Sequence, residues 1–127
     1  MPITIAYSHQ GHIVIMELID PWTMTDLAEC FPIVGEFRDS KPFIVHNLMD
    51  MTRTKVAPPG MMRAREAPLF SHPRGGYMVI IGGTSLLLAV TEAIGALKHF
   101  DRLKTFSTRA EGFAFLESKI AQEPPTP

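Results

Sequence analysis

The sequence predicts an α/β protein whose mixed, mostly parallel sheet has about five strands and about four helices, in the order ββαβαβαβα. Two observations lead to this prediction. Short apolar segments alternate along the chain with segments whose apolar residues recur at helical spacing. Between residues 77 and 99, an apolar segment, a glycine pair and an amphipathic segment follow one another directly, as strand, turn and helix.

The chain is expected to open with a β-hairpin. Residues 3–7 alternate between apolar and polar side chains, as a half-buried strand does, and residues 13–19 form a second strand. Gly11 lies between them and can adopt the positive φ that a tight turn requires. Pro21 ends the second strand because it has no N–H group to donate.

A helix is predicted to follow. Thr23 and Asp26 have the spacing of a capping box at its start, and Thr25 is the competing N-cap residue. Leu27, Phe31 and Val34 then recur at helical spacing and form its buried face.

Three further residues of this segment carry expectations. Pro32 removes one backbone hydrogen bond, so a kink or a break is expected there. Trp22 is expected to pack in the core rather than stack on a ligand. Cys30 is the single cysteine, which excludes an internal disulfide, and its apolar neighbours indicate an inert buried thiol.

Residues 43–51 are predicted to form a central strand, because both of its faces are apolar. His46 and Asn47 lie inside it and are interpreted as hydrogen-bonded core residues rather than ligands. Asp50 and Thr52 mark its carboxyl end, where parallel sheets place functional groups.

The chain then passes through an irregular segment before it returns to the sheet. A turn is predicted at residues 57–60, a short helix at 61–70 and a strand at 77–81. A longer helix over residues 84–99 follows the glycine turn. Its predicted buried face comprises Leu86, Val90, Ala93, Ile94 and Leu97.

The chain is expected to end with a short strand and a helix. Residues 103–106 form the strand, and Thr108 with Glu111 has the spacing of a capping box. One domain is therefore expected over residues 1–122, and residues 123–127, with three prolines, are expected to form a disordered tail.

Charge and composition argue against several classes of protein. The 127 residues have a formal net charge of −1, which provides no global attraction to nucleic acid or membranes. Residues 51–76 are basic, and aromatic residues are not interleaved among them, so nucleic-acid binding is not expected. They either neutralise the acidic first part of the chain or form an anion-binding surface. The basic residues are Arg53, Lys55, Arg63, Arg65 and Arg74.

Location is predicted from the absence of targeting signals. The N-terminus has no basic region followed by an apolar run, so no secretory signal is expected. Residues 77–100 have about the length of a membrane span, but a Gly-Gly-Thr-Ser sequence interrupts them. We therefore expect a cytoplasmic protein without membrane insertion.

The order of elements and several short motifs resemble the STAS-like or SpoIIAA-like family, in particular its small, stand-alone and largely uncharacterised bacterial members. The resemblance covers residues 11–116. It implies a regulatory module that acts through protein–protein contacts and not through catalysis. The matching motifs are Trp22-Thr23, Asp50-Met51-Thr52, Ala57-Pro58-Pro59-Gly60, His72-Pro73-Arg74 and the Thr-x-x-Glu start of the last helix.

The chain departs from the family at the phosphorylation site. Anti-sigma-factor antagonists of this family are switched by phosphorylation of a serine just after the third strand. The corresponding turn, residues 57–60, has no hydroxyl group, and Thr52 and Thr54 lie nearby without matching the pattern. A phosphoserine switch of this kind is therefore not expected.

A ligand site is the second functional hypothesis. A glycine turn before a helix N-terminus exposes N–H groups that suit an anion, although turn formation and N-capping explain the same residues. Neither the dinucleotide pattern nor a phosphate-loop lysine is present. An open polar pocket into which Arg74 points would favour this hypothesis, and a closed sheet edge at Gly82 would favour the interaction module. The candidate residues are Asp50, Thr52, Arg74, Gly82, Gly83, Thr84 and Ser85.

No catalytic residue, metal ligand set or cofactor is predicted. His9 and His12 lie close together in a turn without a third ligand nearby. A homodimer is expected, as well as a regulatory protein partner, because the chain has more large apolar residues than one small core needs. The residues that prompted the dimer prediction are Met24, Phe37, Met61 and Met62.

Overall fold

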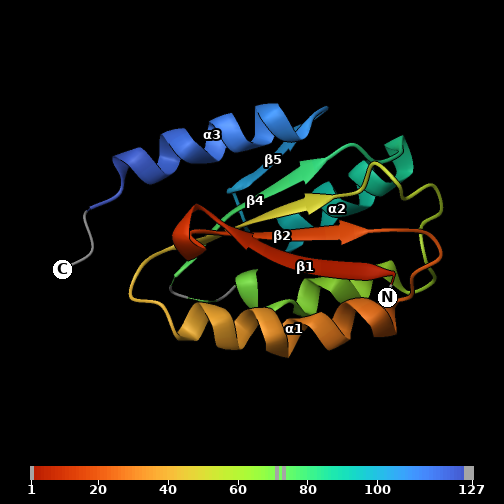
Figure 1. Cartoon of the computed structure of the whole chain (residues 1–127). Helices are drawn as coiled ribbons and strands as arrows, with labels where there is room; N and C mark the ends of the chain where they lie inside the picture. Colours follow the sequence, from red (N-terminus) through yellow and green to blue (C-terminus); the bar gives the residue numbers. More distant parts are fainter. Residues whose placement is uncertain (1, 71, 73, 125–127) are drawn as a thin grey trace.

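The computed structural model describes residues 2–70, 72 and 74–124. It contains a five-stranded sheet with the spatial order β1-β2-β3-β4-β5 (Figure 1). β1 pairs with β2 in antiparallel orientation, and the other neighbouring strands are parallel, which confirms the predicted fold class. The strands are β1 (Ile3–Ser8), β2 (Ile13–Leu18), β3 (Val45–Asp50), β4 (Gly75–Ile81) and β5 (Leu103–Phe106).

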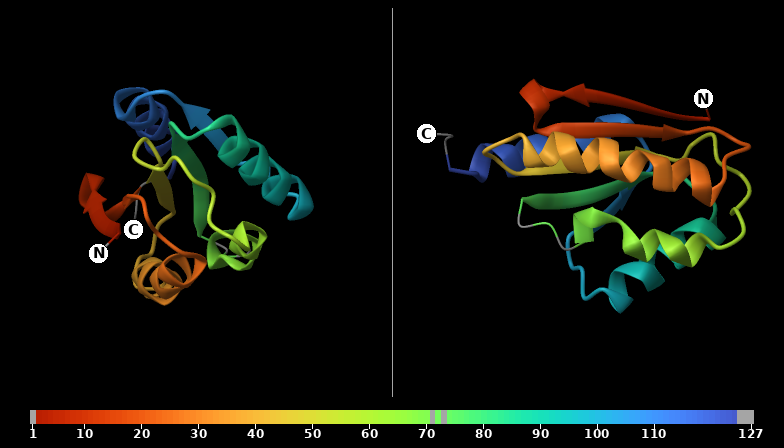
Figure 2. Two further views of the ribbon diagram at one scale, coloured as in Figure 1. Left: turned by 90° about the vertical axis from the view of Figure 1, so that its right-hand side faces the viewer. Right: turned by 90° about the horizontal axis from the view of Figure 1, so that it is seen from below.

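Helices cover both faces of the sheet (Figure 2). Each parallel connection crosses in the same direction, and right-handed crossovers therefore place all three connections on one face. That face, the α1–α2 face, carries α1 (Met24–Asp39), the short 3₁₀ helices η2 (Met61–Glu66) and η3 (Pro68–Phe70), and α2 (Ser85–Leu97). The opposite face, the α3 face, is covered by α3 (Arg109–Gln122).

Strand residues alternate between these two faces, and each face has its own core. Leu48 and Val79 belong to the core beneath α3. Val14, Met16 and Ile80 belong to the larger core beneath α1 and α2. The sheet thus separates two hydrophobic cores, one on each of its faces.

α1 begins as predicted and continues further than predicted. The Thr23 side chain accepts a hydrogen bond from Asp26 N, and Asp26 accepts from Thr23 N in return, so the capping box is confirmed. The helix runs through Pro32 without ending there. Pro32 is exposed, so water can take the place of the hydrogen bond that the proline ring removes.

The predicted helix at residues 61–70 forms two 3₁₀ segments, η2 and η3. Ala67 lies between them, and Pro68, the first residue of η3, has no N–H group with which to continue the helical ladder of η2. Short segments of this length commonly adopt 3₁₀ geometry.

The predicted buried face of α2 is wrong for most of its residues. Leu86 is 62% exposed and Leu97 is 56% exposed, whereas Leu87 and Gly95 are buried. Ile94 alone is buried as predicted. The helix is apolar on nearly all sides, so periodicity identifies two candidate faces and does not distinguish between them. Ala93 is exposed together with the two leucines.

Residues 123 and 124 of the predicted tail belong to the described residues. Glu123 lies beside the sheet and accepts a hydrogen bond from His46, which the sequence pattern did not reveal. The prediction of disorder for residues 125–127 lies outside the described residues.

Candidate functional site

Asp50 lies at the carboxyl end of β3, and both oxygens of its carboxylate accept hydrogen bonds. Its Oδ1 atom accepts hydrogen bonds from the Thr52 backbone N at 2.9 Å and from Thr52 Oγ1 at 2.7 Å. Its Oδ2 atom accepts from Arg109 Nε, at the start of α3, at 2.5 Å. The side chain of Asp50 therefore fastens α3 to the sheet.

The protonation of Asp50 reflects these bonds. Burial raises the pKa of Asp50, but the hydrogen bonds from Thr52 and from Arg109, together with the charge of Arg109, outweigh it and hold the pKa below its ordinary value. A carboxylate with this environment stays ionised and is a poor general acid or base near neutral pH.

The glycine turn closes the same edge of the sheet. Gly82 has a φ of +70°, and a Cβ atom at this position would lie 2.8 Å from Thr52 Cγ2 and 3.1 Å from Thr52 Cα. Thr84 caps α2 by accepting a hydrogen bond from Leu87 N at 3.3 Å. Gly83, with a φ of +94°, completes the turn, and Ser85 is the exposed first residue of α2. The residues of this turn thus have structural roles.

Arg74 does not join these residues. It directly precedes β4, at the opposite end of that strand from Gly82. Its Nη2 atom donates to the carbonyl of Asp39 at 3.4 Å, at the end of α1. The pocket that the sequence suggested, with Arg74 pointing toward the carboxyl ends of the strands, is therefore not formed.

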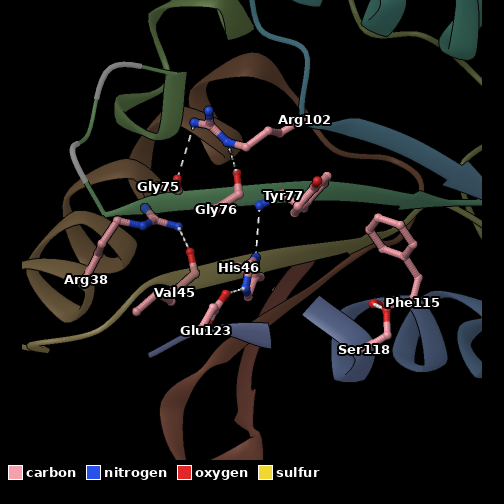
Figure 3. A network of polar contacts seen from close by, with 10 residues as sticks. All are labelled: Arg38, Val45, His46, Gly75, Gly76, Tyr77, Arg102, Phe115, Ser118 and Glu123. Carbon is pink, nitrogen blue, oxygen red and sulfur yellow. Dashed lines mark hydrogen bonds and ion pairs between the residues drawn. The ribbon is translucent and has the colours of Figure 1, made fainter. Parts of the chain in front are cut away.

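His46 lies at the other end of α3 and has a matching role (Figure 3). Its Nδ1 atom accepts from Tyr77 N at 2.9 Å, so Nε2 carries the proton and donates to Glu123 Oε1 at 2.6 Å. Burial lowers the pKa of His46, with help from the charges of His12 and Arg38, although Glu123 raises it. His46 is thus a neutral core residue that holds the end of the chain.

A cavity of about 70 Å³ lies on the α1–α2 face, between the sheet and the helices. Its wall is almost entirely apolar and comes from β2, β3, β4, α1, the 3₁₀ segments and α2. Five methionines contribute to the wall: Met16, Met49, Met51, Met61 and Met78. Trp22, the single tryptophan, also lines it and is 5% exposed.

The cavity contains one charged residue in its lining, Arg38. This side chain is 1% exposed. Its Nη2 atom donates to Asn47 Oδ1 at 2.5 Å and to the Val45 carbonyl at 3.3 Å, as Figure 3 shows for Val45. Among the described residues, Arg38 Nε has no hydrogen-bond acceptor, and no carboxylate forms an ion pair with the guanidinium.

Burial lowers the pKa of Arg38 to about 10, while the charge of Asp39 raises it, so the guanidinium remains charged at neutral pH. Sequence reasoning missed this residue because a basic residue in the last turn of a helix is ordinary. A signal was present, since Arg38 continues the apolar stripe of Leu27, Phe31 and Val34 at the next helical position.

The second feature of interest is an apolar stripe on the outer side of α2, the α2 seam. It comprises Leu86, Val90, Ala93 and Leu97, of which Leu86, Ala93 and Leu97 are exposed. The spacing of four, three and four residues is that of the interface positions in a helix pair. The residues that prompted the dimer prediction lie outside α2. Met24 is buried, Met61 lines the cavity, Phe37 is half-buried and Met62 is 38% exposed.

Within the described residues, no group of three or more His, Cys, Asp or Glu side chains is placed to hold a metal ion. No helix in that part of the chain has both the length and the apolarity needed to cross a membrane. Searches against protein-family models, curated proteins and solved structures returned no match to this chain.

Proposed function

We propose that this protein is a non-catalytic interaction module that forms a homodimer through the α2 seam. The observation that carries the proposal is a stripe of four apolar residues at the spacing of a helix-pair interface, three of them exposed and Val90 half-buried. An isolated soluble protein gains nothing from an exposed stripe of this kind, and contiguous apolar surface commonly marks an interaction site.

The seam is self-complementary. Leu86 and Leu97 are equally far from its middle, and so are Val90 and Ala93. An antiparallel pairing about a twofold axis would therefore place each leucine against the other leucine of the second copy, and Val90 against Ala93. The small side chain of Ala93 would let the two helices approach closely. Only Glu92 is ionisable between residues 78 and 97, so few charges oppose the pairing.

The expected dimer is weak. Burial of the exposed leucines of both copies contributes roughly 6 kcal/mol before the cost of association, which is of similar size. The two contributions nearly cancel, so a dissociation constant in the millimolar range or above is expected. An interaction of this strength suits a regulatory module that acts through protein–protein contacts, as the resemblance to STAS-like proteins implies.

The hydrogen bonds of Asp50 and His46 and the pKa of Cys30 support the proposal that the protein is not a catalyst. Asp50 and His46 are occupied by bonds that fasten α3. Burial raises the pKa of the Cys30 thiol, with smaller contributions from the charges of Glu29 and Asp26, so the reactive thiolate is disfavoured. A cytoplasmic location remains part of this proposal.

The alternative is a protein that binds a small molecule or an anion, or an unrecognised enzyme, at the strand ends near Asp50 and Gly82. The contact between Gly82 and Thr52 and the bonds of Asp50 do not favour that location. For ligand binding, the cavity beside Arg38 is the better supported place.

The test measures the oligomeric state over a range of concentrations by analytical ultracentrifugation. We expect the wild-type protein to dimerise and Leu97→Ser to remain monomeric, because the substitution removes one apolar contact at each end of the pair. Val56→Ser is the matched control, since Val56 is 70% exposed but lies outside α2, and this variant should dimerise like the wild type.

A wild-type protein that stays monomeric at every concentration would overturn the homodimer. Binding of such a monomer to phosphatidylcholine vesicles would assign the seam to a membrane surface instead. Equal loss of dimer in Leu97→Ser and Val56→Ser would show that the seam is not the interface.

A further inference from the structure

We propose that the cavity on the α1–α2 face binds a short aliphatic carboxylate whose head group pairs with Arg38. This inference is independent of the homodimer, because the cavity lies on the inner side of α2 and the seam lies on its outer side. It rests on the size of the cavity, the chemistry of its wall and the state of Arg38.

The size and the wall define the tail of the ligand. A cavity of 70 Å³ has room for about five water molecules, or for a chain on the order of five carbons. Water is poorly suited to this wall, because a buried water needs several polar partners and the lining is almost entirely apolar. An aliphatic chain would instead gain contacts with the apolar lining.

The shape of the lining indicates a chain rather than a compact group. Residues of α1 contribute to the wall at successive turns, from Leu27 through Cys30 and Val34 to Arg38. An aliphatic chain that runs parallel to α1 would therefore have its head at the Arg38 end. The methionines of the wall are flexible and can adapt to chains of somewhat different length.

Arg38 defines the head group. A guanidinium buried without a counter-ion is costly, because the attraction that normally offsets desolvation is missing. The Nε atom has no acceptor among the described residues, whereas Asn47 and Val45 already hold Nη2. A carboxylate oxygen beside Nε would supply both the missing acceptor and the missing charge.

The single positive charge favours a carboxylate over a phosphate. Arg38 is the one charged residue in the lining, so a monoanion would be neutralised there. A phosphate dianion is larger and would keep an uncompensated charge in an apolar space.

The experiment uses the fluorescence of Trp22, because this single tryptophan lines the cavity. The wild-type protein is titrated with hexanoate and, separately, with hexanol, which has the same chain without the charge. We expect saturable changes with both probes, and tighter binding of hexanoate by about tenfold or more, the size expected for a hydrogen bond to a charged group.

The variant Arg38→Met tests the role of the guanidinium. It should lose the preference for hexanoate while it still binds hexanol, and retained hexanol binding shows that the variant is folded with its cavity intact. Arg74→Met is the matched control. Arg74 also lies near the end of α1, through its bond to Asp39, but does not line the cavity, so this variant should keep the preference.

Three results would overturn the inference. Equal affinity of the wild type for hexanoate and hexanol would show that the guanidinium does not select the head group. If Arg38→Met still bound hexanoate more tightly than hexanol, the guanidinium would again not be the group that selects the head group. The absence of any saturable response to either probe would show that the cavity is not a ligand site.

Discussion

The two faces of the sheet differ in how completely side chains fill the space beneath the helices. On the α3 face, packing is so close that a Cβ atom added at Gly112 would lie 2.6 Å from Ile81 Cδ1. The buried core residues there are Ile13, Leu48, Val79, Ile81 and Leu116, each 0% exposed. On the α1–α2 face, a cavity of about 70 Å³ remains among methionines and one buried arginine.

Polar bonds reinforce this difference. Asp50 and Arg109 fasten the start of α3, and His46 and Glu123 fasten the chain just beyond its end. The α3 face thus combines a filled core with a polar bond at each end of the helix, whereas the opposite face has room to accept a ligand. One layer thus stabilises the sheet, while the other retains space for binding. Three further predictions test this difference between the two faces of the sheet.

The largest expected effect comes from Leu116→Ala. Leu116 is 0% exposed on the filled face, so its truncation should lower the free energy of unfolding by about 3 kcal/mol. Urea denaturation measures the change. Met61→Ala is the comparison on the other face, and it should cost only about 1 kcal/mol because Met61 is half-buried beside an existing cavity. Similar losses in both variants would contradict the difference between the faces.

Acid should weaken the bonds at the ends of α3 in two stages. The folded protein keeps the pKa of His46 below its ordinary value of 6.5, so the unfolded chain binds more protons as the pH falls below that value. Stability should therefore decline as the pH falls below 6.5, by no more than about 1.4 kcal/mol per pH unit for this single proton. The pKa of Asp50 is also lowered, so a second decline is expected below 3.8.

Urea denaturation at a series of pH values measures both stages. His46→Gln should remove the first stage and keep the second. A first stage that persists in His46→Gln would assign it to another group.

The smallest expected effects come from a matched pair of glycine substitutions. A Cβ atom at Gly112, on α3, would lie 2.6 Å from Ile81 Cδ1 and 3.1 Å from Val79 Cγ1, whereas a Cβ atom at Gly35, on α1, has nothing within 4 Å. Gly35→Ala should raise the melting temperature, because alanine stabilises a helix by about 1 kcal/mol relative to glycine. Gly112→Ala should lower it, because the strain of overpacking exceeds that gain by about 1 kcal/mol. An increase in both variants would show that the α3 face is no tighter than the other.

The sequence by itself determined those features that depend on neighbouring residues. The capping box of Thr23 and Asp26, the positive φ of Gly11 and the turn at Gly82 each involve only a few consecutive positions. The alternation of strands and helices follows from local periodicity in the same way, and right-handed crossovers then make the sheet largely parallel.

Only the tertiary structure decided which side chains meet across the fold. His46 and Glu123 are 77 residues apart, and Arg109 reaches Asp50 across 59 residues. Arg74 reaches the carbonyl of Asp39 across 35 residues. Local patterns contain no information on these distances.

The α2 seam and the buried Arg38, on which the functional proposals rest, also depend on tertiary packing. α2 is apolar on nearly all sides, so only packing against the sheet decided that Leu87 is buried and Leu86 exposed. Arg38 continues an apolar stripe that the sequence displays, but its burial without a counter-ion depends on what surrounds it in three dimensions. Periodicity identifies the faces of a helix, and tertiary packing decides which face meets the core.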